Sequence, residues 1–365
     1  MRTGMAIGLT CALATAGWHS AASASGRNWS AVHDEVQAFV DEHGMNGAGL
    51  IVVTRDGGVV HEDYWGDFDA DRVSFVASTS KQVTAGVLLH LADQGLVDLD
   101  APVADVVPWG AGNPEVSVAD LVGNTSGLVG LDPNPVYAPY LCQFIPTEEL
   151  EACGEAIFTT ADDDADIVAP GTEYRYGGAQ WQVAGAVAEA VSGKSWGELI
   201  EEIYVQPCGL TGFGYNNHYA VFNTTFEYPA AFDGDPASLP ATANPNMEGG
   251  LYTTVADYGR LLQMQLDGGV CGDTQVLSAE ALATMYTDRL APLGLEAIPG
   301  VGYGYGWWTD RATGILYDPG AYGASAVIDP EAGWAYYLAV ETTGENGFVL
   351  SEQIRDDIVA LVTEG

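Results

Sequence analysis

A serine and a lysine stand three residues apart in the segment SFVASTSKQVTAGVLLHLADQG, as Ser78 and Lys81. At that spacing two side chains share one face of a helix. A lysine that is partly buried and neutral can take the hydroxyl proton and so activate the serine as a nucleophile. The alternative is a serine that caps the start of a helix beside a solvated lysine. The chain has only two lysines, Lys81 and Lys194, so a chance match to this spacing is unusual.

The surrounding segments predict the elements that would position this pair. A helical apolar spacing runs over residues 28–44 and ends at glycine, and the Ser78 segment continues as a helix to Gly95. Two strands joined at Asp56 and Gly57 read as a hairpin. Further elements follow from the same patterns: helices in VAGAVAEAVSG and WGELIEEIYV, three strands over residues 313–342, and an amphipathic helix over 351–365. Strands at both ends and a helical middle predict a sheet built from the two ends, with a lobe inserted between them.

The first residues read as a secretory signal. One basic residue is followed by an apolar run and by small residues that end at Ala24, so we expect cleavage after residue 24. An uncleaved anchor is the alternative. No other run approaches the length needed to cross a bilayer. We therefore expect a secreted or periplasmic protein with no stable membrane insertion once the signal is removed.

Four cysteines remain after the signal: Cys142, Cys153, Cys208 and Cys271. An even number in an exported chain favours two disulfides, for which three pairings exist. We expect Cys142–Cys153 as a local bridge together with Cys208–Cys271.

The chain is strongly acidic, with a formal net charge of −39. Such a charge repels nucleic acid and anionic membranes. It is typical of proteins that work in high salt, and simple solubility of a secreted protein is the other explanation. The histidines have no metal-ligand spacing, and the acidic run at 162–166 lacks the glycine of a calcium-binding loop. We expect no metal and no cofactor.

Several motifs together resemble one known superfamily. FVASTSKQVTAGVLLHLADQGLVDLDAPVADVVP is similar to the SxxK segment of serine beta-lactamases and penicillin-binding proteins, in the class C-like branch that includes esterases and D-aminopeptidases. VADLVGNTSGL, PGTEYRYGGAQWQVAG, EGGLYTTVADYGRLLQMQLDGG and DPGAYGASAVIDP resemble that branch's later motifs, in the correct order. The resemblance covers nearly all of the chain after the signal.

This resemblance implies an α/β fold: a beta-lactamase-like sandwich with a mainly antiparallel sheet flanked by helices, plus an inserted, mainly helical lobe. The domain organisation would be a signal peptide at 1–24 and one catalytic domain at 25–365. Its sheet lobe would come from about 28–77 and 271–365, and its helical lobe from about 78–270.

The resemblance also assigns roles to individual residues. Ser78 would be acylated, Lys81 would accept its proton, and Tyr176 would shuttle protons to the leaving group and from water. The backbone N–H groups of Ser78 and Ala321 would form the oxyanion hole. Gly320, beside Ala321, would let the substrate approach the strand closely.

Two positions depart from the family pattern at the expected substrate-binding residues. Gly178 stands where the YxN motif has asparagine, and Asp318 stands where the family has lysine or histidine. An acid at that position would repel a substrate carboxylate. We therefore expect a secreted serine hydrolase of small esters or amides, with D-amino-acid peptides as one option. The alternatives are a beta-lactamase or D-alanyl-D-alanine carboxypeptidase, and a non-catalytic module that binds peptidoglycan or another ligand.

Overall fold

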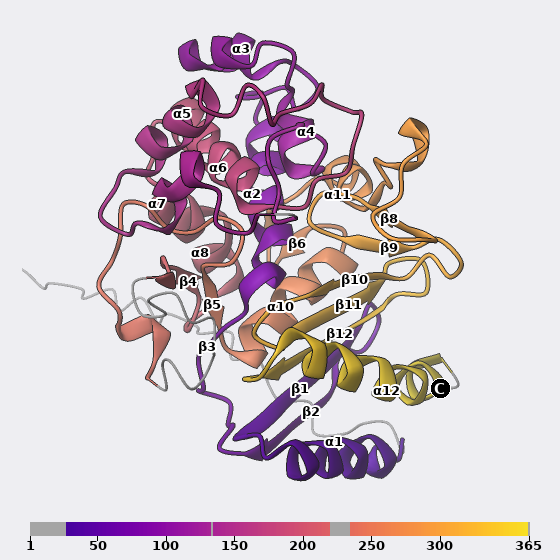
Figure 1. The fold of residues 1–365 in the computed structure, drawn as a ribbon. Coiled ribbons are helices and arrows are strands. Elements are labelled where there is room, and N and C mark those ends of the chain that lie inside the picture. The colour runs from indigo at the N-terminus through magenta and orange to yellow at the C-terminus, as the bar shows by residue number, and fades with distance from the viewer. Residues whose placement is uncertain (1–26, 133, 220–233, 364–365) are drawn as a thin grey trace, which may run out of the picture.

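A computed structural model describes residues 27–132, 134–219 and 234–363 (Figure 1). The predicted signal peptide and Cys11 lie outside the described residues. The helices are α1 (Ser30–His43), α2 (Lys81–Asp93), α3 (Val103–Val106), α4 (Val118–Val122), α5 (Leu150–Thr159), α6 (Gly178–Ser192), α7 (Trp196–Ile200), α8 (Gln206–Cys208), α10 (Val255–Leu266), α11 (Ala279–Tyr286) and α12 (Gly344–Thr363). The strands are β1 (Gly47–Thr54), β2 (Gly58–Gly66), β3 (Ser74–Phe75), β4 (Gly214–Tyr215), β5 (Leu251–Thr253), β6 (Val270–Cys271), β7 (Thr274–Gln275), β8 (Val301–Tyr303), β9 (Trp308–Asp310), β10 (Leu316–Pro319), β11 (Ser325–Asp329) and β12 (Trp334–Val340).

The main sheet has seven strands in the order β2-β1-β12-β11-β10-β9-β8. Every pairing within it is antiparallel. The N-terminal hairpin therefore joins the C-terminal strands directly, with Ala48 opposite Val340 in β1 and β12. This confirms the predicted antiparallel sheet built from the two ends of the chain.

Helices cover both faces of this sheet. In Figure 1, α1 and α12 lie on one side, and α10 lies on the other, between the sheet and the helical lobe. Strand β1 is buried on both faces, and its side chains alternate between them. Leu50 and Val52 pack with the α1 and α12 residues, whereas Ile51 packs with the core that includes α10.

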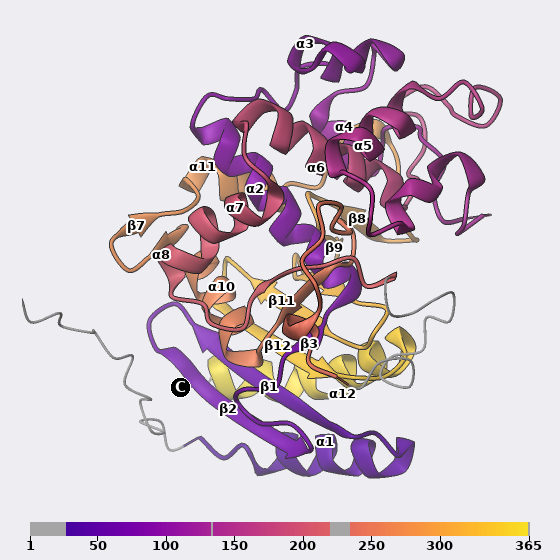
Figure 2. The ribbon, with the colours of Figure 1, turned by 90° about the vertical axis from the view of Figure 1, so that its left-hand side faces the viewer.

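Helix α2 is the central element of the helical lobe, which lies above the sheet in Figure 2. All its residues from Lys81 to Leu89 are buried, so it has no solvent-facing stripe. Its first residue is the lysine of the predicted pair. The beginning of α2 thus meets the sheet, and its far end contacts the start of α11, where the Ser278 amide donates to the Asp93 carboxylate at 2.7 Å.

Both expected disulfides are present. Cys142 bonds to Cys153 and Cys208 bonds to Cys271, which confirms the predicted pairing. Within the described ranges, no helix is long and apolar enough to cross a membrane.

Candidate active site

Ser78 lies in a tight turn just before α2. The turn is a 3-10 helix over Ala77–Ser80, so the α-helix itself begins at Lys81 and not at the serine. Ala77 has a φ of 48°, in the left-handed region that residues other than glycine rarely adopt. Strain of this kind persists only where neighbouring structure imposes it, and it is frequent beside catalytic groups.

Two tyrosines, Tyr258 and the partly buried Tyr215, hold this turn. Tyr258 donates its hydroxyl hydrogen bond to the Thr79 carbonyl oxygen, at 2.9 Å, and Tyr215 donates to the Ser80 carbonyl oxygen, also at 2.9 Å. The Ser80 hydroxyl donates to the Ala77 carbonyl oxygen at 2.6 Å. The backbone around Ser78 is therefore fixed by side chains from β4 and α10.

Lys81 is completely buried, with 0 % of its surface exposed. Its Nζ atom lies 3.1 Å from the Ser78 Oγ atom. Burial acts to lower the pKa of Lys81, but the nearby Tyr176 and the carboxylate of Glu248 outweigh it, so the pKa is raised. The structure thus brings the predicted serine and lysine into direct contact, in surroundings that favour the charged form of the lysine.

Tyr176 stands over the same lysine. The Lys81 Nζ atom is 4.6 Å from the centre of the Tyr176 ring. Burial raises the pKa of Tyr176, and interactions with Lys81 and Ser78 oppose that rise. All three residues to which sequence reasoning gave proton-transfer roles therefore meet at one place.

The loop that carries Tyr176 is held by a second buried residue with positive φ, Asn124 at 57°. Gln180 donates to the Asn124 Oδ1 atom and to the Arg175 carbonyl oxygen, at 2.6 Å each. The Leu131 amide donates to the Tyr176 carbonyl oxygen at 2.7 Å. The Asn124 carbonyl oxygen accepts from the Arg175 amide at 2.9 Å, so Asn124 and Gln180 together fix the backbone just before Tyr176.

The end of β10 passes directly beside the serine turn. A Cβ atom on Gly320 would lie 2.0 Å from the Val76 carbonyl oxygen, so only glycine fits this approach. The Thr79 hydroxyl donates to the Asp318 carbonyl oxygen at 3.1 Å and ties the strand to the turn. Among the described residues, no group accepts a hydrogen bond from the Ser78 or Ala321 amide. Both amides expected to form the oxyanion hole are therefore unengaged.

Glu248 is a site residue that sequence reasoning missed. Its Oε2 atom is 3.4 Å and its carbonyl oxygen 3.1 Å from the Lys81 Nζ atom. A Cβ atom on Gly178 would lie 2.1 Å from the Glu248 Oε1 atom. The carboxylate thus fills the space beside the glycine that replaces the family's asparagine. The sequence shows a glycine at position 178 and an acid just before Gly249, but only the fold brings these two positions into contact.

The pairing of strand β3 with strand β5 explains how Glu248 comes to lie beside Ser78 and Lys81. Phe75 is opposite Tyr252 in this antiparallel ladder, and the Val76 amide donates to the Leu251 carbonyl oxygen at 3.1 Å. Continuing that register brings the residues just before β5 alongside the serine turn. Glu248 is therefore positioned by the strand that leads into Ser78.

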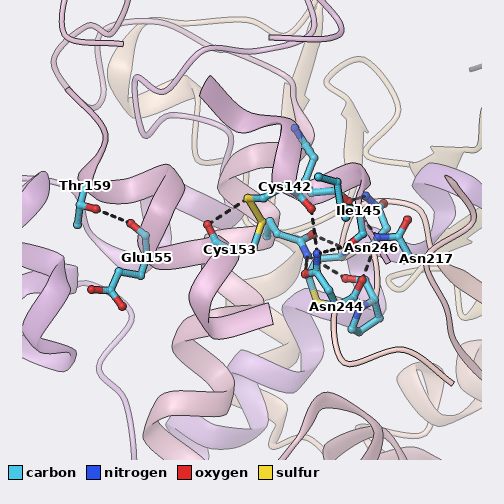
Figure 3. Close-up of a disulfide and its surroundings, with 12 residues drawn as sticks. Cys142, Ile145, Cys153, Glu155, Thr159, Asn217, Asn244 and Asn246 are labelled. Atoms are coloured by element: carbon cyan, nitrogen blue, oxygen red, sulfur yellow. Dashed lines mark hydrogen bonds between the residues drawn. A yellow bond between two sulfur atoms is a disulfide. The ribbon is translucent and has the colours of Figure 1, made fainter. Parts of the chain in front are cut away.

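Asparagines beside the Cys142–Cys153 disulfide hold the segment that leads to Glu248 (Figure 3). Asn244 donates to the carbonyl oxygens of Cys142 and Ile145, at 2.9 and 3.0 Å. Asn217 donates to the carbonyl oxygens of Gln143 and Asn244, at 3.1 and 2.9 Å. The disulfide-linked turn and the Glu248 segment therefore form one hydrogen-bonded unit.

Asp318 differs from the expected acid in an open cleft. It is 0 % exposed, and neither carboxylate oxygen has a hydrogen-bond partner in the described part of the chain. Strand alternation is the reason, because Asp318 and Leu316 share the buried face of β10 while Tyr317 and Pro319 are half-buried. Burial raises its pKa far above the usual value, and the charge of Lys81 opposes this only in part. Asp318 is thus a buried acid whose surroundings favour the neutral form, and it does not line the open surface.

A cavity of about 890 Å³ adjoins Tyr176. Tyr174, Tyr176 and Trp308 give it aromatic walls, and its carboxylates are Asp132, Asp166 and Glu173. Its one arginine, Arg175, is paired with Glu173 at 2.8 Å. The cavity therefore carries an excess of negative charge beside Tyr176.

A half-buried serine in contact with a buried lysine, with a tyrosine above them, at the end of a strand of an antiparallel sheet, defines the layout of a serine hydrolase. Comparison with known proteins identifies the family: the Beta-lactamase family profile matches residues 32–361. The chain belongs to the Beta-lactamase family, and its enzymatic class is that of the family's serine hydrolases.

Three similar proteins illustrate the family. Penicillin-binding protein 4 of Amycolatopsis lactamdurans is 26 % identical over 336 residues, covering 85 % of this chain and 84 % of the relative. D-aminopeptidase of Brucella anthropi is 29 % identical over 188 residues, covering 47 % of this chain and 33 % of the relative. The solved structure of EstCE1, a hydrolase with promiscuous acyltransferase activity, superposes with a TM-score of 0.71 at 21 % identity, over 92 % of this chain and 98 % of that one.

Proposed function

We propose that this chain is an exported serine hydrolase that forms an acyl-enzyme at Ser78 and acts on small esters and amides, including amides of D-amino acids. The observation that carries the proposal is the 3.1 Å contact between the Ser78 Oγ atom and the Nζ atom of a fully buried lysine. The two disulfides support an oxidising compartment.

In the proposed reaction the Ser78 Oγ atom attacks the substrate carbonyl carbon and its proton passes to Lys81. The amides of Ser78 and Ala321 stabilise the negative oxygen that forms. The Tyr176 phenol gives a proton to the leaving group, which departs. Water then attacks the acyl-enzyme and releases the acid.

The charges near the site favour neutral or amine-bearing substrates. Glu248 lies beside the nucleophile, and Asp132, Asp166 and Glu173 line the adjoining cavity. A substrate carboxylate would be repelled by these groups, whereas an ammonium group would be attracted and could pack against the aromatic walls. The similarity to a D-aminopeptidase supports the same preference.

The test has two parts. A fluorophosphonate probe should modify Ser78 alone, as mapped by mass spectrometry, and Ser78→Ala should abolish labelling. The purified protein should then show a burst followed by steady turnover with p-nitrophenyl esters or D-aminoacyl amides, and much slower turnover of nitrocefin, which carries a carboxylate. Labelling at another serine would refute the assignment. A burst without turnover would indicate the binding module instead.

A further inference from the structure

The ammonium group of Lys81 has all three of its N–H donors engaged. The acceptors are the Ser78 Oγ atom, the Glu248 carbonyl oxygen and the Glu248 Oε2 atom, at 3.1, 3.1 and 3.4 Å. This arrangement suits a lysine that rests in its protonated form. A protonated lysine has no lone pair with which to accept the proton of Ser78.

One proton must therefore leave Lys81 before Ser78 can be activated. Of the groups around Nζ, the Glu248 carboxylate can take a proton and keep it, whereas burial favours the neutral phenol form of Tyr176. We propose that Glu248 is a positioning residue that holds Lys81 and receives its proton during acylation of Ser78. This inference rests on the proposed function, because it concerns the step that acylates the serine.

The proton movements balance. A proton passes from Nζ to Oε2, which leaves a neutral amine beside a carboxylic acid. The Ser78 Oγ atom then bonds to the carbonyl carbon and gives its proton to Nζ. When the leaving group departs, Lys81 supplies the proton through Tyr176, and Glu248 returns its own proton to Lys81. The ion pair is restored with no net change.

Gly178 shows that the carboxylate has a built position. A Cβ atom there would lie 2.1 Å from the Glu248 Oε1 atom and 2.5 Å from the Gln143 Oε1 atom. The Glu248 side chain is 10 % exposed, so it has little room to move elsewhere. A side chain at position 178 and the carboxylate of Glu248 thus compete for one space.

Other titratable groups face this ion pair from several elements, and burial favours the uncharged form of each. Burial raises the pKa values of Tyr219 and Tyr322, and it raises that of Asp318. Burial and the charge of Lys81 lower the pKa of His218 to about 3. Tyr176 also has a raised pKa, with burial as the main cause. The change in the pH profile on removing the Glu248 carboxylate should therefore report on Lys81.

The experiment measures the rate of fluorophosphonate labelling at Ser78 from about pH 5 to about pH 10. Glu248→Gln keeps the shape of the side chain but cannot hold a proton. We expect about 10- to 100-fold slower labelling near pH 7. The labelling rate should also rise more steeply with pH, because only loss of the Lys81 proton to solvent can now free its lone pair. Glu248→Asp should restore part of the rate.

The matched control is Glu202→Gln, which removes the carboxylate from the chain's other lysine ion pair, Lys194–Glu202, on the surface. It should label like the wild type. A Glu248→Gln profile with the same shape as the wild-type profile overturns the inference, even if labelling is slower, because a structural role would slow labelling equally at every pH. If wild-type Ser78 is not labelled at all, the proposed function itself fails.

A second pair of variants tests whether a side chain at position 178 and the Glu248 carboxylate compete for one space. Gly178→Asn should slow labelling strongly in the wild-type background, because it displaces the Glu248 carboxylate. It should slow labelling far less in a Glu248→Ala background. Equal effects in both backgrounds would contradict the competition between the two positions.

Discussion

Lys81 and Lys194 differ in their surroundings. A comparison of the two lysines therefore gives a controlled test of Lys81 as the group that accepts the proton of Ser78. The Lys81 side chain is buried against Ser78, whereas that of Lys194 is 44 % exposed. Lys81→Ala should lower kcat by about 10²–10⁴-fold, the usual effect of removing a general base. Lys194→Ala should leave kcat unchanged. Steady-state kinetics with a p-nitrophenyl ester would measure both, and a Lys81→Ala enzyme with normal kcat would exclude the assigned role.

Asp318 leads to a prediction about stability and pH. Burial raises the pKa of this carboxyl in the folded protein. Between the ordinary aspartate pKa and this raised pKa, the folded state therefore binds more protons than the unfolded state. As pH rises through that range, Asp318 lowers the free energy of unfolding by an increasing amount. Asp318→Asn removes this cost. We expect the variant to melt about 1–4 °C above the wild type at alkaline pH, with a smaller difference near pH 5.

Calorimetry across this pH range would measure the difference. A gap that shrinks as pH rises would mean that Asp318 is ionised and stabilised in the fold. The acid would then be a partner of Lys81, and not a neutral buried group.

At the scale of elements, the disulfides join the site's supporting turns. Cys142–Cys153 links the turn that contacts Asn244 to α5, and Cys208–Cys271 links α8 to β6. The chain from residue 25 onward should therefore contain no free thiol. Titration under denaturing, non-reducing conditions would detect any. Two reactive thiols per chain would show that one of the bridges does not form.

The elements with strong local patterns were predictable from sequence. The first helix, the β1–β2 hairpin, α6 and the C-terminal strands all appear where apolar periodicity indicated them. The contact of Ser78 with Lys81 was also predictable, since three residues span one helical turn. Helix α12 begins at Gly344, earlier than expected, because its first turn lacks an apolar pattern.

Features that depend on long-range packing were not predictable. The 3-10 turn at Ser78 requires a positive φ at Ala77, which no alanine signals by itself. Glu248 reaches Lys81 only through the β3–β5 register. The burial of Asp318 follows from which face of β10 it occupies, and a shift of one residue would reverse that face.

At the scale of the whole molecule, the net charge of −39 dominates. Within residues 27–132, 134–219 and 234–363, six arginines are neutralised in ion pairs: Arg72–Glu341, Arg175–Glu173, Arg260–Asp257, Arg289–Asp100, Arg311–Asp288 and Arg355–Glu352. Few cations are left to offset the remaining carboxylates, so the folded chain repels itself.

Molar sodium chloride should therefore raise the melting temperature, because the screening length falls from about 10 Å at 0.1 M to about 3 Å at 1 M. Thermal melts over a series of salt concentrations would test this. A salt-independent melting temperature would favour solubility as the explanation for the acidic surface.

The pairing of β1 with β12 also governs when activity can begin. The two strands come from opposite ends of the chain, and β10, which carries the strand end beside Ser78, joins the hairpin only through β11 and β12. Contacts of such high sequence separation form late and slow the folding rate. A nascent chain would hold its nucleophile, its lysine and its tyrosine without the strand that completes their cleft. Chains stalled before β12 should thus react with no fluorophosphonate, and hydrolytic activity would begin only after the last strand has been synthesised and has docked.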